Sequence, residues 1–123
     1  MNLTNIPDDC ANLNAGPLPG GRVYLLSNAM PNANRDPLFV STTVDGLHFN
    51  ATTALTTCTL PFYKGPGQPF GCLYRFPGGA KQGGCQYPQG MSLTAPGVEG
   101  FWAIFSLNKE DIWVVHAPFS SLA

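Results

Sequence analysis

The chain has 123 residues, the length of one ordinary domain, and its 44% hydrophobic content excludes a disordered protein. Only 11% of the residues are charged and the net charge is −1 without a basic cluster, so neither nucleic acid nor an anionic membrane is an expected partner. The 14 glycines and 12 prolines predict short strands joined by many turns, as in an all-β protein. A helix bundle is excluded because no stretch repeats apolar residues at helical spacing over successive turns.

The first half of the chain predicts a three-stranded antiparallel meander. Residues 1–21 are expected to be irregular because Asn, Asp, Gly and Pro dominate them. Residues 22–27 predict a strand that is covered on both sides, because apolar residues fall on both of its faces. Two more strands should follow at 37–43 and 48–54, joined at Asp45-Gly46, the strongest hairpin signal in the sequence.

The middle of the chain, residues 56–85, is a loop-rich insert with one short strand expected at 73–76. Its glycine spacing matches neither a P-loop nor a dinucleotide-binding loop. Three strands are predicted in the last third of the chain, at 86–93, 101–106 and 112–116. We therefore expect a single domain over 1–123, with blade-like units at about 18–55 and 86–118 on either side of the insert.

The four cysteines show no CxxC spacing, so a metal knuckle or a redox motif is not expected. The preferred disulfide pairs are Cys72–Cys85 and Cys10–Cys58, and the alternative is four free buried thiols. A Cys72–Cys85 bond would close a loop of about 14 residues and stabilise the fold by about 3 kcal/mol. The even cysteine count and the glycosylation acceptor patterns at Asn2 and Asn50 favour a secreted origin. Such acceptor patterns often arise by chance, so the compartment stays open.

The sequence shows neither a signal peptide nor a membrane-spanning segment. The first residues lack the basic and apolar regions of a signal peptide. No apolar run in the chain reaches the ~20 residues of a membrane span. We therefore expect neither a signal peptide within this chain nor a membrane as a partner.

Five segments of the chain form a pattern when they are taken together: Leu18 to Leu25, Arg35-Asp36-Pro37-Leu38, Ser41 to Phe49, Gln86-Tyr87-Pro88 and Phe105 to Ile112. In this order they resemble the C-terminal blades of sialidase-like (neuraminidase, BNR/Asp-box) β-propellers. The resemblance covers about residues 15 to 118 and is weakest in the insert. The resemblance implies an all-β fold in which antiparallel meanders form about two blades of a six-bladed propeller.

The segment Thr43 to Phe49 resembles a degenerate Asp box. Asp45 and Gly46 are adjacent, whereas the family usually places one residue between them, and Phe49 takes the place of the usual aromatic residue. In the family this box is a turn remote from the active site. The resemblance therefore implies a structural role for Asp45, Gly46 and Phe49.

The resemblance also implies two functional residues. Family enzymes bind a substrate carboxylate with three arginines, and they use a tyrosine nucleophile paired with a glutamate and an aspartate as acid/base. Arg35 lies where one of these arginines is expected, and a guanidinium suits a carboxylate because it forms two parallel hydrogen bonds. Tyr87 resembles the nucleophile. The alternatives are a solvated strand-end arginine and a packed core tyrosine, and Lys109 and Glu110 are expected in a tight turn.

The catalytic set is incomplete, because no other arginine and no acid/base carboxylate can be assigned. We therefore expect part of the glycan-binding cleft of a glycoside hydrolase-type protein, without a cofactor or metal and not catalytic alone. A glycan or sialoside-like ligand is the expected partner, and the remaining blades or a homo-oligomer should cover the open sheet faces. Two alternatives stay open: a self-standing, disulfide-stapled β domain with a binding or structural role, and an active glycosidase assembled from several chains.

Overall fold

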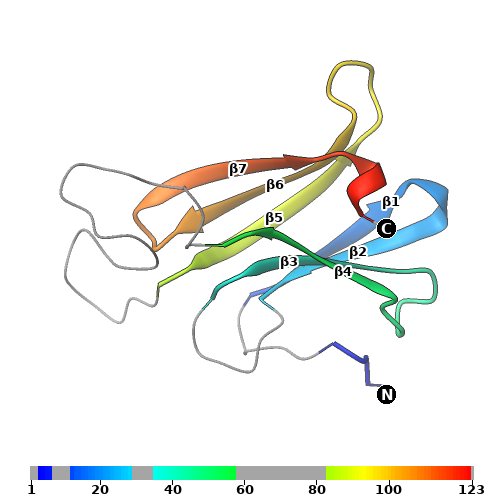
Figure 1. The fold of residues 1–123 in the computed structure, drawn as a ribbon, viewed down its shortest axis with the longest axis horizontal. Coiled ribbons are helices and arrows are strands. Elements are labelled where there is room, and N and C mark those ends of the chain that lie inside the picture. The colour runs from blue at the N-terminus through cyan, green and yellow to red at the C-terminus, as the bar shows by residue number, and fades with distance from the viewer. Residues whose placement is uncertain (1–2, 7–11, 29–34, 58–82, 123) are drawn as a thin grey trace.

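The computed structural model describes residues 3–6, 12–28, 35–57 and 83–122. These residues form an all-β structure of two antiparallel sheets, as Figure 1 shows. The first sheet has the strand order β1-β2-β3-β4, with β1 Asn14–Leu18, β2 Arg22–Ser27, β3 Leu38–Thr43 and β4 Ala51–Thr56. The second has the order β5-β6-β7, with β5 Cys85–Leu93, β6 Gly100–Leu107 and β7 Asp111–Ala117. Two short 3-10 turns, η1 Pro19–Gly21 and η2 Phe119–Ser121, are the helical elements of the described residues.

The predicted all-β class is confirmed at the level of two antiparallel sheets, and two details of the first sheet differ from the prediction. The prediction of irregular chain up to residue 21 is wrong for β1, which pairs with β2. Pro17 is tolerated there because β1 is an edge strand, where a missing N–H need not interrupt the ladder. In addition, β4 begins at Ala51, whereas the sequence predicted a strand from residue 48. The strand expected at 73–76 lies outside the described residues.

The hydrophobic core lies between the two sheets. Alternation along each strand sends one set of side chains inward, so Tyr24 and Leu26 of β2 and Val40 of β3 share a buried cluster with Phe101 and Phe105 of β6. The rings of Tyr24 and Phe101 meet edge to face with centroids 4.8 Å apart. Burial of each large apolar side chain contributes ~1.5–3 kcal/mol, so this contact layer holds the sheets together.

Polar contacts between β1 and β5 fix how the two sheets are aligned. The Tyr24 hydroxyl lies 2.6 Å from Gly90 O and 2.8 Å from Asn14 Oδ1, and it can donate to either. Gly90 N donates to Asn14 Oδ1 over 2.9 Å, and Ser92 Oγ donates to Pro17 O over 2.5 Å. A Cβ on Gly90 would lie 2.7 Å from the Phe101 ring of its own sheet and 3.0 Å from the Tyr24 ring of the other sheet, so glycine leaves room for both rings between the sheets.

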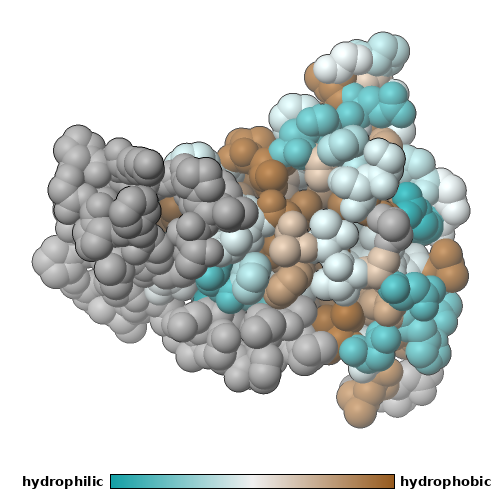
Figure 2. Space-filling model, viewed as in Figure 1, coloured by the Kyte–Doolittle hydropathy of each residue, from teal (hydrophilic) through white to brown (hydrophobic). Residues whose placement is uncertain are grey.

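The outer face of the second sheet carries exposed apolar side chains in the part of the chain that the structure describes. Register places Ile104 beside Val114 on this face, and both side chains are exposed, as are Ile112 and Met91. Hydrophobic residues gather along this part of the molecule in Figure 2. The sequence shows apolar residues on both faces of β6 and β7. In the structure, one of these faces packs against the core and the other is exposed.

Candidate functional site

The structure brings Arg35 and Tyr87 together although 51 residues separate them. Arg35 forms a parallel bridge with Gly84, in which Cys85 N donates to Arg35 O over 2.7 Å and Arg35 N donates to Gly83 O over 3.4 Å. This bridge ties the chain before β3 to the start of β5. The guanidinium carbon of Arg35 consequently lies 5.5 Å from the centroid of the Tyr87 ring. Arg35 is thus a cation over a phenol, within the range of a cation–π contact.

Lys109 is a third member of this site. It lies in the turn between β6 and β7, and its Nζ is 5.6 Å from the centroid of the Tyr87 ring. The turn is anchored beside Tyr87, because Gly84 N donates to Asn108 Oδ1 over 2.7 Å and Asn108 N donates to Gly84 O over 2.9 Å. Sequence reasoning placed Lys109 in a tight turn but did not bring it to the phenol. The sequence signal that could have drawn attention to Lys109 is its position within Phe105 to Ile112, one of the segments on which the resemblance to sialidase-like propellers was based.

Backbone strain is concentrated at the same place. Among the described residues, the non-glycine residues with positive φ are Tyr87 at 52°, Asn108 at 57° and Lys109 at 58°. Each costs ~1–3 kcal/mol, and strain of this kind clusters at functional sites. Tyr87 lies in a β-bulge, where the pairing of β5 with β6 shifts register between Gln86 and Gln89. The bulge leaves the Tyr87 side chain about half exposed, so it is not a packed core tyrosine.

The electrostatics of the site favour negative charge. A hydrogen bond with Lys109 and the charge of Lys109 lower the pKa of the Tyr87 phenol, and Arg35 lowers it further. Partial desolvation opposes these effects. Arg35 Nη1 also donates to Gln86 Oε1 over 3.4 Å, which holds the guanidinium near the β5 bulge. The described side chains therefore present two cations and a phenolic O–H to an incoming group.

Cys85 lies next to this site as a buried, free thiol. Its side chain belongs to the core between the sheets. The Cys72–Cys85 bond stays a prediction, because Cys72 lies outside the described residues. Burial, together with the negative charge of Asp36, raises the pKa of Cys85 to about 12, which makes the thiol a poor nucleophile. Cys10, Cys58 and Cys72 lie outside the described residues.

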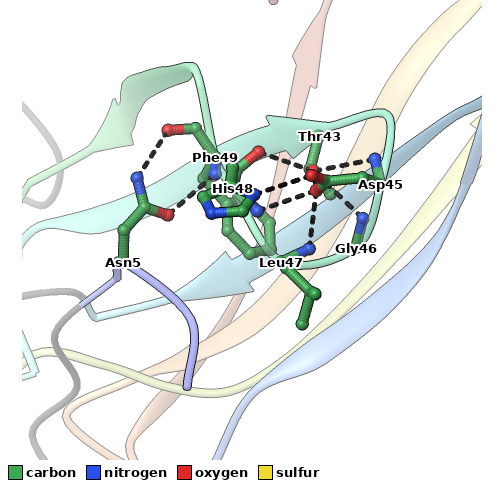
Figure 3. A network of polar contacts seen from close by, with 7 residues as sticks. All are labelled: Asn5, Thr43, Asp45, Gly46, Leu47, His48 and Phe49. Carbon is green, nitrogen blue, oxygen red and sulfur yellow. Dashed lines mark hydrogen bonds and ion pairs between the residues drawn. The ribbon is translucent and has the colours of Figure 1, made fainter. Parts of the chain in front are cut away.

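The Asp45 turn lies at the other end of β3 from Arg35 (Figure 3). Asp45 Oδ1 accepts hydrogen bonds from Leu47 N and His48 N, both at 2.8 Å, and His48 Nδ1 lies 2.7 Å from Asp45 Oδ2. These bonds from His48 and Leu47 hold the pKa of Asp45 well below its usual range. Gly46 adopts φ 77°, as the Asp-Gly signal predicted. The connection is longer than a two-residue hairpin because the carboxylate organises the chain as far as His48.

Phe49 follows this turn and is tied to the N-terminal part of the chain. Asn5 Nδ2 donates to Phe49 O over 3.1 Å, and Phe49 N donates to Asn5 Oδ1 over 2.8 Å, so one amide side chain pairs with both backbone groups. Figure 3 shows this pair beside the Asp45 network. Asp45, Gly46 and Phe49 are therefore turn residues away from Arg35 and Tyr87.

Other basic residues of the described part of the chain have partners elsewhere. Arg22 is the first residue of β2, and its Nη1 donates to Leu122 O over 2.7 Å. Arg75 lies outside the described residues. His116 stacks on Trp102 with centroids 4.3 Å apart. Within the described ranges, no group of three or more His, Cys, Asp or Glu side chains is placed to hold a metal ion.

Comparisons with protein-family models, with curated proteins and with solved structures found no significant match for this chain. None of the helices in the part of the chain that the structure describes has the length and apolar character needed to cross a membrane.

Proposed function

We propose that this chain is part of a sialidase-like β-propeller and contributes one side of a cleft that binds an acidic sugar, without being catalytic alone. The observation that carries the proposal is the meeting of Arg35, Lys109 and Tyr87 at one end of the two sheets. An acidic sugar offers a carboxylate for the cations and hydroxyl groups for the phenol. A guanidinium and an ammonium that both lie near one phenol favour a carboxylate, because charge-assisted hydrogen bonds are about twice as strong as neutral ones.

The arrangement of the sheets supports a blade-like assembly. Each sheet follows chain order from one edge to the other, as consecutive hairpins of a propeller blade do. The first strands of the two sheets, β1 and β5, contact each other, and so do the last strands, β4 and β7. The exposed apolar face of β5 to β7 is the kind of surface that a further blade or a second copy would cover.

The position of the Asp45 turn also agrees with the resemblance. In a sialidase-like protein the box is remote from the ligand, and here β3 separates Asp45 from Arg35. The turn is closed by its own hydrogen bonds rather than by groups at the proposed cleft. Its role in the proposal is to join β3 and β4.

Glycoside hydrolysis needs two functional groups on opposite sides of the scissile bond. The cluster at Tyr87 supplies a candidate nucleophile and two cations, and we assign no acid/base group to it. We therefore propose binding rather than turnover for the isolated chain. The alternative is a self-standing domain stapled by disulfides, and its predicted Cys72–Cys85 bond involves a residue outside the described part of the chain. Solution mass separates these proposals, because a stable monomer favours the self-standing domain.

Binding of N-acetylneuraminic acid, measured by NMR titration, tests the proposal. Replacement of Arg35 by methionine removes a charge-assisted contact of ~1.5–3 kcal/mol, so we expect affinity to fall about 10- to 100-fold. The methyl ester of the same sugar is the matched control, because it lacks the negative charge. Equal affinity for the acid and the ester would overturn the proposal. Turnover of a fluorogenic sialoside that Tyr87→Phe abolishes would instead support a glycosidase assembled from several chains.

A further inference from the structure

Three separate segments converge on the Tyr87 phenol: the residues before β3, the bulge in β5 and the turn between β6 and β7. Gly84 holds all three in place. Its backbone bridges to Arg35, and its N–H and C=O pair with the side chain and N–H of Asn108. Lys109 directly follows Asn108 in the chain. The ammonium group is therefore carried by a strained turn that is tied to the same strand start as the phenol.

We propose that Lys109 is a positioning residue that holds the Tyr87 hydroxyl, and that anion binding at this site depends on whether Tyr87 is protonated. This inference rests on the proposed function only for the class of anion. Lys109 is suited to the role because its contact at the site is to the phenol itself. Arg35 is shared between the Tyr87 ring and Gln86 Oε1. The phenol thus has a cation as its main partner, whereas the enzymes that the chain resembles pair their tyrosine with a glutamate.

The charge of the site changes when Tyr87 ionises. With the phenol protonated, the site presents two positive charges and an O–H donor, all of which favour a carboxylate. With the phenol ionised, the phenolate forms an ion pair with Lys109, which neutralises that positive charge, and the phenolate itself repels the anion. Among the described residues, the charged groups that act on this phenol are Lys109 and Arg35, while the Asp36 carboxylate acts on Cys85 instead.

The sign of the pH dependence follows from linkage. An anion that binds the protonated form more tightly must raise the pKa of Tyr87 when it binds. Equivalently, anion affinity is highest below the pKa of Tyr87 and falls as the pH rises through that value. Because Lys109 lowers the pKa of Tyr87, the affinity for the anion should be lost at a lower pH than it would be if the pKa of Tyr87 were that of an isolated tyrosine.

An ultraviolet difference titration of the full chain tests the role of Lys109. The chain has four tyrosines, and subtraction of the Tyr87→Phe curve isolates Tyr87 from the other three. We expect a wild-type midpoint below that of free tyrosine, a midpoint moved toward free tyrosine in Lys109→Met, and a midpoint kept low in Lys109→Arg. An unchanged midpoint in Lys109→Met, or equal shifts in both variants, would overturn the proposal.

A second measurement needs no change at Lys109. Added salt screens the attraction between the cations and the phenolate, so the wild-type midpoint should rise with ionic strength. A midpoint that does not respond to salt counts against the proposal. For the second half of the proposal, the affinity for N-acetylneuraminic acid should fall across the Tyr87 midpoint in the wild type and stay level in Tyr87→Phe. A midpoint set by Lys109 without any sugar binding would support the positioning role and overturn the proposed function instead.

Discussion

Replacing Gly84 by alanine should open the junction on which the whole site depends. Gly84 has φ 113°, which L side chains rarely adopt, and a Cβ there would lie 2.3 Å from Arg35 O and 2.5 Å from Arg35 C. Both contacts are with backbone atoms, so no side-chain movement relieves them. The chain before β3 must move away from β5, and the 2.7 Å bond from Cys85 N to Arg35 O is lost.

The loss of folding free energy in Gly84→Ala is the sum of two contributions. The disfavoured φ costs ~1–3 kcal/mol, and a buried backbone group left without its partner costs ~1–3 kcal/mol. We expect Gly84→Ala to lower the free energy of unfolding by about 4 kcal/mol, which corresponds to about 15 °C in Tm for a chain of this length. Binding of N-acetylneuraminic acid should also weaken, because Arg35 moves away from Tyr87.

Gly97→Ala is the matched control. Gly97 also has a positive φ, 86°, but a Cβ there meets no atom within 4 Å. Only the cost of the left-handed conformation applies, about 1–2 kcal/mol. Thermal unfolding followed by circular dichroism measures both variants. If Gly84→Ala loses no more stability than Gly97→Ala, the close approach of Arg35 and Gly84 is not what holds the site together, and the reasoning is refuted.

Two further predictions concern titratable groups. Because bonds from His48 and Leu47 lower the pKa of Asp45, its contribution to stability is present above the unfolded value of ~4 and is lost as the pH falls through the folded value. Asp45→Asn should therefore lower Tm at neutral pH, and a variant-to-wild-type difference that stays constant into acid would contradict this. Cys85 should resist iodoacetamide in the native chain and react in denaturant without reductant, and a peptide map that finds Cys85 linked to Cys72 would show that the thiol is not free.

The strands that the sequence predicted well are those with a local signal. The predicted ranges 22–27, 86–93, 101–106 and 112–116 lie within or nearly match β2, β5, β6 and β7. The edge strand β1 was missed because Gly16 and Pro17 weaken any local strand signal, and pairing with β2 compensates for them. The start of β4 was placed too early because the side chain of Asp45, rather than Asp-Gly backbone preference alone, determines the length of the connection.

Local patterns in the sequence determined the all-β class and most strand positions, whereas Arg35 and Tyr87 were chosen as residues to examine from the resemblance to sialidase-like propellers. Only the tertiary structure decided that these two side chains meet, that Lys109 joins them, and that Cys85 is a core thiol. The physical reason is that these contacts join residues far apart in the chain. Their geometry depends on the stacking of two sheets and on a backbone approach at Gly84 that no local preference specifies.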